Sequence, residues 1–494
     1  MKSPLFSLTQ KLTPALALAI GLTACSFAGD EDHIRTVVID DDQTRINPVG
    51  TRLNHASSTM RAAIARGLVG LDESGRVVPA LAARWIVTDD GLSYIFRLGE
   101  ARWDDGRQIT AERIARLLTE RVSELKNSRL ENDLQVIDEV ISMTGRVIEI
   151  KLKAPSPNFL QLLAQPEFGL FRAGHGAGPM RLVDENAGMR LGIFEEPSSN
   201  NEEAEEDDRW VLLNREPAAK AIARFDAGYV DIILNGRFYH LPFIDQSGID
   251  SNSLQLDPIA GLFGLRFVSA EGFWTVPENR EILSMSIDRP ALLTSFPSVT
   301  AWKIRQKIIP EALDVEGINA RPEWSRMTMG DRREFALNHV RGWKATEGDI
   351  KPLAIGLPNA PGADILFLRI RSDLQRVGLD AERVGMNDKA DARLIDEIAP
   401  YDSARWFLSQ LTCERTPVCL NDADTKLEEA DAATNLEIKA RLYAEVEQDL
   451  VDHYNYIPLG VPVRWSLARP GQRGFSVNPR GWHPLNPLVG IPIS

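Results

Sequence analysis

The chain has 494 residues, 44% of them hydrophobic, and a formal net charge of −14. A chain of this length can form several hydrophobic cores, so we expect more than one domain. The negative charge argues against nucleic acid as a partner, and no apolar run beyond the amino terminus is long enough to span a bilayer.

The amino terminus has the pattern of a bacterial lipoprotein signal peptide. Lys2 and Lys11 precede the apolar run 12–22, and the sequence Leu-Thr-Ala-Cys ends at Cys25. We predict that residues 1–24 are removed and that Cys25 is lipidated, which would anchor the chain to a membrane from outside the cytoplasm. The alternative is an ordinary signal peptide with a cysteine at its cleavage site. Both interpretations predict export.

The first predicted elements of the exported chain are a strand over 33–40 and, further on, a sheet–turn–helix unit. In this unit a short amphipathic segment, 80–85, precedes a strand over 92–98 in which apolar and polar residues alternate. Thr110 is placed to cap the helix that follows, and the apolar stripe of this helix extends to Leu125.

Further elements follow from similar signals. The acidic run 195–208 holds eight acidic residues and no basic one, which indicates a solvated insertion between two strands rather than a cation-binding site. Pro217 is expected in the first turn of a helix that ends near residue 228, and a strand over 230–234 comes next. Helices are predicted over 364–377 and 435–451.

The residues between 67 and 118 resemble the first conserved block of the extracytoplasmic solute-binding proteins of the peptide/nickel ABC transporter class, family 5. The matching residues are Pro79, Ala80, Leu81, Ala82, Trp85, Asp90, Gly91, Phe96, Leu98, Trp103, Asp105, Gly106, Thr110 and Ala111. Further segments resemble the same family in the same order, namely 154–163, 176–182, 221–234, 279–293 and 443–458. The resemblance covers nearly the whole chain.

This resemblance implies a mixed α/β, type II-like periplasmic binding protein with two main lobes and a small extra domain. Domain II would be 68–168 and domain III 262–460, and domain I would combine 25–67, 169–261 and 461–494. Because the chain would pass between domains I and III near Gly261 and near Gly460, two adjacent strands would form a hinge.

The ligand is less clearly indicated. In peptide-binding members a "W.aDy.dP" segment supplies an acid for the peptide amino group, and the corresponding stretch 401–411 has no acid at that position. Tyr401 and Trp406 are candidates for stacking on a ligand, and Arg405 and Gln410 for holding a polar group. Trp406 in an apolar strand would alternatively belong to the core.

The histidines and cysteines support few further sites. His55, near Asn54, is a candidate for the cleft or an ordinary surface histidine, and the scattered histidines form no metal motif. In an exported protein Cys413 and Cys419 favour a disulfide over a metal pair or free thiols. We predict no metal and no cofactor.

The expected function is therefore that of a monomeric, lipid-anchored binding protein of an ABC importer on the periplasmic or extracellular face of a membrane. It would capture a peptide or related small organic solute and deliver it to permease subunits. An enzyme is not expected, because the chain has no GxSxG elbow, P-loop or GxGxxG turn. The alternative is a degenerate binding-protein fold that acts as a sensor or interaction lipoprotein without transport.

Overall fold

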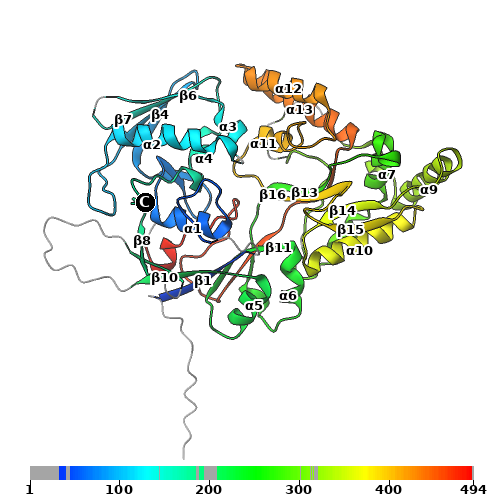
Figure 1. The fold of residues 1–494 in the computed structure, drawn as a ribbon, viewed down its shortest axis with the longest axis horizontal. Coiled ribbons are helices and arrows are strands. Elements are labelled where there is room, and N and C mark those ends of the chain that lie inside the picture. Colours follow the sequence, from blue (N-terminus) through cyan, green and yellow to red (C-terminus); the bar gives the residue numbers. More distant parts are fainter. Residues whose placement is uncertain are drawn as a thin grey trace, which may run out of the picture.

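The structure is a computed structural model that describes residues 33–40, 45–128, 130–143, 145–184, 188–193, 209–300, 302–311, 313, 315 and 321–491. The predicted signal peptide, Cys25 and the acidic run 195–208 lie outside the described residues. Three large sheets define three lobes, which are called lobes I, II and III below (Figure 1). Within these ranges no helix has the length and apolarity needed to cross a membrane.

Lobe I is built on a seven-stranded sheet with the order β12-β18-β11-β1-β10-β9-β8. Its strand β1 pairs in parallel with β10 and β11 and is buried on both faces, which explains its nearly continuous apolar sequence. The strands and helices of lobe I are β1 (His33–Ile39), α1 (His55–Ile64), β8 (Met180–Asp184), β9 (Met189–Ile193), β10 (Trp210–Glu216), α5 (Ala218–Asp226), β11 (Ile232–Arg237), α6 (Leu241–Asp245), β12 (Leu254–Leu256) and β18 (Arg464–Ala468).

Lobe II contains a four-stranded antiparallel sheet with the order β4-β5-β7-β6. The predicted alternation appears in β5, where Tyr94, Phe96 and Leu98 are buried, and Thr110 Oγ1 accepts a hydrogen bond from the Arg113 amide at the start of α2. The elements of lobe II are β2 (Val69–Leu71), β3 (Val77–Pro79), β4 (Ala82–Val87), β5 (Ser93–Leu98), α2 (Ala111–Glu124), α3 (Glu131–Leu134), β6 (Ile137–Ser142), β7 (Val147–Leu152) and α4 (Phe159–Leu163).

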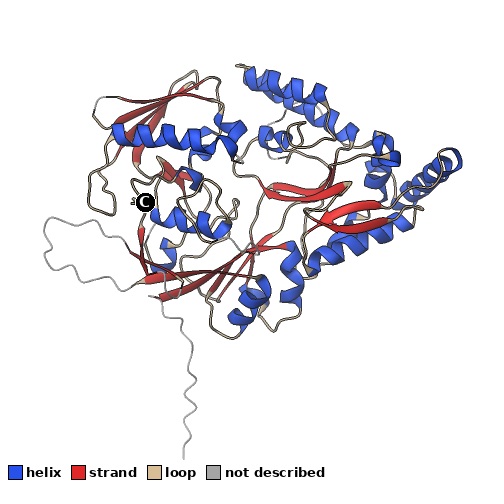
Figure 2. Cartoon of the chain, in the orientation of Figure 1, coloured by secondary structure: helices blue, strands red, loops and turns tan. Residues whose placement is uncertain are grey.

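Lobe III contains a five-stranded mixed sheet with the order β15-β14-β16-β13-β17, and Figure 2 shows the helices around it. Its elements are β13 (Gly261–Phe267), α7 (Pro277–Ser286), α8 (Arg289–Leu293), α9 (Met329–Thr346), β14 (Leu353–Leu357), α10 (Pro361–Gln375), β15 (Ala381–Gly385), β16 (Ala392–Ile398), α11 (Ala404–Ser409), α12 (Asn421–Ala432), α13 (Leu436–His453) and β17 (Tyr456–Gly460).

Several boundaries and one element type differ from the sequence-based expectation. The helices expected over 364–377 and 435–451 are α10 and α13, with slightly different ends. Pro217 precedes α5 as its N-cap instead of lying in its first turn, and the strand expected over 230–234 begins and ends later, as β11. The expectation of a strand around Trp406 is wrong. The chain turns after β16 and forms the short helix α11, in which Trp406 and its two following residues are all buried.

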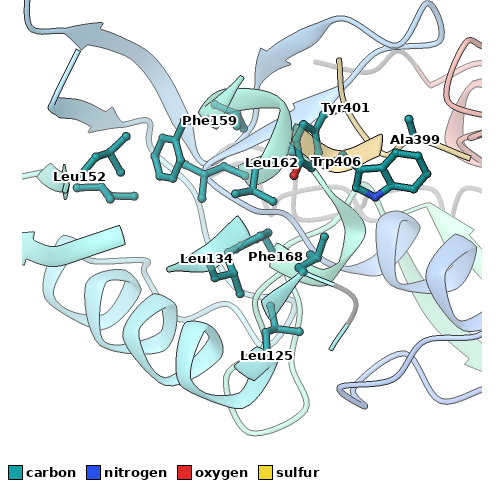
Figure 3. Packing of buried hydrophobic residues seen from close by; sticks show 14 of the residues in the cluster. Leu125, Leu134, Leu152, Phe159, Leu162, Phe168, Ala399, Tyr401 and Trp406 are labelled. Atoms are coloured by element: carbon teal, nitrogen blue, oxygen red, sulfur yellow. The ribbon is translucent and has the colours of Figure 1, made fainter. Parts of the chain in front are cut away.

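The sheet strands fall within the predicted ranges of domains I, II and III, except that β13 begins one residue early, at Gly261. Two hydrophobic cores of equal size cross lobe boundaries. One joins lobes I and III, and in it the ring centroids of Phe238 and Phe263 lie 4.9 Å apart. The other core lies between lobes II and III. It joins Phe159, Leu162 and Phe168 of lobe II to Tyr401 and Trp406 of lobe III (Figure 3). Lobes II and III therefore share a continuous apolar contact, while the domain division itself stays a prediction.

Candidate functional site at the junction of the lobes

The chain passes between lobes I and III twice, and the two crossing segments lie side by side. On the lobe I side Leu256 of β12 pairs with Trp465 of β18, and on the lobe III side Phe263 of β13 pairs with Gly460 of β17. The connecting segments, 257–260 and 461–463, are therefore short and antiparallel. A pair of short adjacent crossings is the arrangement that allows one lobe to rotate against another.

Close backbone packing marks the first crossing. A Cβ atom added at Gly261 would lie 2.0 Å from the carbonyl oxygen of Glu397. Only glycine fits this approach of β13 to β16 without a shift of the backbone. The position where the chain enters lobe III is thus fixed by sterics.

Next to this crossing, two arginines of lobe I meet one carboxylate of lobe III. Arg464 Nη1 donates to Asp396 Oδ1 at 2.7 Å, and Arg464 Nη2 donates to the Asp396 carbonyl at 2.8 Å. Arg237 Nη1 lies 3.6 Å from Asp396 Oδ2. The side chains of Arg464 and Asp396 are only 3% and 6% exposed. The cluster therefore has an excess of positive charge in a poorly solvated place.

The pKa values of the two arginines respond differently to this environment. Burial lowers the pKa of Arg464, with Asp396 acting in the opposite direction. Burial also acts to lower the pKa of Arg237, but the charge of Asp396 and of other acids outweighs it and raises the pKa overall. Both groups stay charged at neutral pH, because a guanidinium does not lose its proton there.

The predicted residues Asn54 and His55 lie at the start of α1, close to this cluster. Asn54 Oδ1 accepts a hydrogen bond from the Ser57 amide at 2.8 Å and caps the helix. His55 Nε2 lies 3.0 Å from Arg237 Nη2. His55 is exposed, so the structure places it at the edge of the junction of lobes I and III.

A second charged cluster joins lobe III to lobe II through the predicted residues Arg405 and Tyr401. Arg405 Nη1 donates to Asp133 Oδ1 of lobe II at 2.9 Å, and Arg405 Nε donates to Asp431 of its own lobe at 2.8 Å. Tyr401 also hydrogen-bonds to Asp133. Burial raises the pKa of Asp133 even though Arg405 is adjacent to it. The side-chain groups expected to hold a ligand are thus engaged in contacts within the protein.

The other two predicted residues in this stretch also contact the protein itself. Trp406 is 6% exposed, and its ring centroid lies 5.0 Å from that of Phe407. Gln410 Nε2 donates to the Trp406 carbonyl and to Ser409 Oγ, each at 3.3 Å. The structure brings Tyr401, Arg405 and Trp406 together near lobe II but leaves Gln410 inside lobe III.

A third set of contacts joins all three lobes. Arg480, from the carboxy-terminal segment, donates from Nη1 to Asp402 Oδ1 of lobe III at 2.9 Å. The Asp402 amide donates to Gln161 Oε1 of lobe II at 2.8 Å, and Gln165 Nε2 donates to the Pro400 carbonyl at 2.8 Å. These polar contacts surround the segment that precedes α11.

A recess lined in part by Gln165 lies between lobes I and II. It encloses about 620 Å³ of empty space, including its open mouth. Its wall is mainly apolar, and its few polar residues include Gln165 and Asn486. Trp482 lines it as well, with its indole Nε1 buried and without an acceptor.

The structure joins Cys413 and Cys419 by a disulfide, in the loop between α11 and α12. In the described part of the chain no group of three or more His, Cys, Asp or Glu side chains has a metal-binding arrangement. Asp133, Asp396, Arg237 and Arg480 were not found by sequence reasoning. Each meets its partner from a distant part of the chain, and no local pattern marks them.

The middle part of the chain is similar to a known protein family. The model of "Bacterial extracellular solute-binding proteins, family 5 Middle" matches residues 76–312. The matched region is similar to this family and covers just under half of the chain. The family 5 match runs from the start of lobe II, through the second part of lobe I, into lobe III.

Solved structures with the same fold cover nearly the whole chain. The Escherichia coli murein tripeptide binding protein MppA has a TM-score of 0.74 and 18% sequence identity, over 92% of this chain and 97% of that chain. Haemophilus influenzae OppA in complex with RPPGFSPFR has a TM-score of 0.73 and 16% identity, over 94% and 99%. At these identities the likeness establishes the type II-like periplasmic binding protein fold.

Curated relatives match over shorter regions. The glutathione-binding protein GsiB of Escherichia coli O1:K1 is 28% identical over 158 residues, which are 31% of this chain and 29% of that protein. The probable deoxycholate-binding periplasmic protein YgiS of Escherichia coli K12 is 30% identical over 118 residues, which are 20% and 22%. The chain thus matches less than a third of the length of these relatives.

Proposed function

We propose that the chain is the solute-binding lipoprotein of an ABC importer. It captures a peptide or related small organic solute between lobes I and III and delivers it to permease subunits. It acts as a monomer, without a cofactor, on the periplasmic or extracellular face of a membrane, to which the lipid on Cys25 anchors it.

The pair of adjacent crossings is the observation that carries this proposal. Two short segments, 257–260 and 461–463, connect lobes I and III. The lobes also meet through the ion pair of Arg464 and Asp396 and through an apolar core that includes Phe238 and Phe263. A solute bound between two such lobes contacts both of them only when they are closed, so binding shifts the population to the closed form. A permease can then recognise the closed form.

The relatives and the stretch 401–411 together indicate which class of solute to expect. The relatives and structural neighbours are named for glutathione, deoxycholate, a murein tripeptide and a nonapeptide. The stretch 401–411 has no acid at the position that holds a peptide amine in peptide-binding members, and its Arg405 is already paired with Asp133 and Asp431. We therefore expect solutes without a free amine to bind at least as well as free peptides.

The test uses the protein exported to the periplasm with Cys25→Ser, which removes the lipid. Native mass spectrometry before and after denaturation detects a co-purified solute. Small-angle X-ray scattering then measures whether glutathione, a murein tripeptide or deoxycholate reduces the radius of gyration. A bound solute together with compaction supports capture by closure. A protein that arrives empty and neither compacts nor gains thermal stability with any of them contradicts it.

The alternative is a sensor or interaction lipoprotein that keeps the fold without transport. It is favoured by one observation, namely that lobe III is already joined to lobe II by Arg405 and Asp133 and to the carboxy-terminal segment by Asp402 and Arg480. In that case the scattering curve of the empty protein would already match the curve calculated from the present structure. Added solutes would leave that curve unchanged.

The lipid anchor has a separate test. Incorporation of labelled palmitate into the full-length protein, but not into Cys25→Ser, would support lipidation at Cys25. Equal labelling of the two proteins, or none in either, would contradict it.

A further inference from the structure

A segment of lobe III between α8 and α9 lies beside the second crossing. It comprises residues 302–305 and is called the strap below. The Val461 amide donates to the Lys303 carbonyl at 3.0 Å, and Ile304 forms an antiparallel bridge with Gly460. A Cβ atom at Gly460 would lie 2.9 Å from the Lys303 carbonyl oxygen, so only glycine fits this approach without a shift. The strap thus pairs with the end of β17 as a short additional strand.

Two side chains of the strap bond to the backbone of both crossings. Trp302 Nε1 donates to the Val461 carbonyl at 2.7 Å. Arg305 Nη1 donates to the Gly261 carbonyl at 3.1 Å. Val461 and Gly261 lie where the two crossings meet lobe III. One short segment therefore holds both crossings at this boundary.

The strap is itself anchored in lobe III. The amides of residues 308 and 309 donate to Glu447 Oε1 of α13 at 2.9 and 2.7 Å, and Glu447 is buried. The ring centroid of Trp302 lies 5.3 Å from that of Phe263 in β13 and 6.1 Å from that of Phe238 in lobe I. The strap consequently belongs to lobe III but lies at its boundary with lobe I.

On the lobe I side the two crossings bond to each other. The Asp257 amide donates to the Arg464 carbonyl at 3.0 Å, which extends the pairing of β12 with β18. On the lobe III side the pairing of β13 with β16 extends to Ala260, whose carbonyl accepts from the Ala399 amide at 2.9 Å. The backbone left between these bonds is 258–259 in the first crossing and 462–463 in the second.

Each of these two pieces begins with a proline, Pro258 in one and Pro462 in the other. Proline has no amide hydrogen and a fixed φ, so it ends the ladder of backbone hydrogen bonds that comes from either lobe. Rotation between the lobes must then come from the remaining torsions of these pieces. Protein hinges are formed by a few such residues that absorb the change in φ and ψ.

We propose that residues 302–305 are a third part of the hinge. They hold both crossings to lobe III, and they confine the rotation between lobes I and III to 258–259 and 462–463. This inference rests on the proposed closure of the lobes around a solute. A confined pivot leaves the empty protein fewer arrangements to lose on closure, so the strap favours binding of the solute.

The first experiment measures the freedom of the lobes without any solute. Spin labels are placed on the Cys25→Ser protein at Tyr229→Cys of lobe I and Phe335→Cys of lobe III, where the native side chains are exposed. Cys413 and Cys419 form a disulfide, so only the two introduced thiols take a label. Double electron–electron resonance then gives the distribution of distances between the labels.

The strap is altered by Trp302→Phe, alone and together with Arg305→Met. Trp324→Phe is the matched control, because Trp324 Nε1 donates to Tyr454 Oη at 3.2 Å inside lobe III, away from the crossings. We expect a broader distribution of distances in Trp302→Phe, a still broader one in the double variant, and no change in Trp324→Phe. An unchanged distribution in the double variant, or equal broadening in Trp324→Phe, overturns the role of the strap.

Hydrogen exchange measures the size of the effect at the crossing itself. Trp302→Phe removes the bond to the Val461 carbonyl but keeps an aromatic ring in the core. The loss of this hydrogen bond should make the Val461 amide exchange roughly two- to tenfold faster, while Trp324→Phe leaves its rate unchanged. Equal rates in the parent and in Trp302→Phe would show that the strap does not hold the second crossing.

A further substitution tests the pivot and leaves the strap intact. Pro258→Gly adds backbone freedom at an exposed position, and Pro157→Gly does the same at an exposed position of lobe II. We expect Pro258→Gly to broaden the distribution of distances and Pro157→Gly to leave it unchanged. If Pro258→Gly also leaves it unchanged, rotation does not occur at 258–259 and the inference is wrong.

The failure of this inference is distinguishable from the failure of capture. If solutes compact the protein while every strap variant keeps the distance distribution of the parent, capture stands and the role of the strap is wrong. If the strap variants broaden the distribution but no solute compacts the protein, the strap stands and capture by closure is wrong.

Discussion

Replacing Asp396 by asparagine tests the buried cluster next to the hinge. Asp396→Asn keeps the shape of the side chain but removes the carboxylate that Arg464, 3% exposed, shares with Arg237. Breaking a buried ion pair by removing one partner costs about 3–5 kcal/mol. The unfolding entropy of roughly 2 cal/mol/K per residue amounts to roughly 1 kcal/mol/K for 494 residues. We therefore expect the melting temperature to fall by about 3–5 °C.

The assay is differential scanning calorimetry, with Asp380→Asn as the matched control. Asp380 pairs with Arg371 at 2.8 Å, but its side chain is 42% exposed, and exposed ion pairs contribute about 0–1 kcal/mol. Adding Arg464→Met to Asp396→Asn removes one of the two arginine charges, so the double variant should regain part of the lost melting temperature. If Asp396→Asn destabilises no more than Asp380→Asn, the cluster is not the desolvated charge site described above.

Two further changes test other charged groups. Arg405→Met leaves Asp133 and Asp431 without the guanidinium that they share. We expect the free energy of unfolding to fall by about 3 kcal/mol and hydrogen exchange in α3 to become faster. Unchanged exchange in α3 would contradict the contact between lobes II and III. Burial, and then the charge of Arg280, lowers the pKa of His453 below 6.5. Because the folded state favours the neutral ring, stability is lost as the pH falls from about 6.5 through the folded pKa. Between pH 7.5 and 5.5 we expect the melting temperature of His453→Gln to fall by less than that of the parent protein. Parallel plots of melting temperature against pH for the two proteins would refute this.

Much of the fold could be predicted because its signals are local. The alternation of β5, the cap at Thr110 and the turn glycines act within a few residues, and each appears in the structure where the sequence indicates it. The passages near Gly261 and Gly460 follow from the family resemblance, and the strand pairing around both agrees with it.

The contacts at the junction of the lobes could not be predicted in this way. Arg405 meets Asp133 across 272 positions of sequence, and Arg237 meets Asp396 across 159. The interpretation of Trp406 as part of a strand failed because three consecutive apolar residues fit a buried strand and a short buried helix equally well. The length of such a segment does not distinguish a buried strand from a short buried helix.

The positions of the charged contacts relative to the crossings determine what opening of the lobes would cost. Asp396 lies two residues before Ile398, which pairs with Gly261 at the crossing itself, so its contacts with lobe I change least when the lobes rotate. Asp133 and Arg405 have no such link and must separate if lobe III leaves lobe II. Asp133 and Arg405 therefore favour the closed form even without solute. A solute shifts the equilibrium only by its own difference in affinity for the two forms, so under the proposed function the contact of Asp133 with Arg405 lowers the difference in affinity that closure requires.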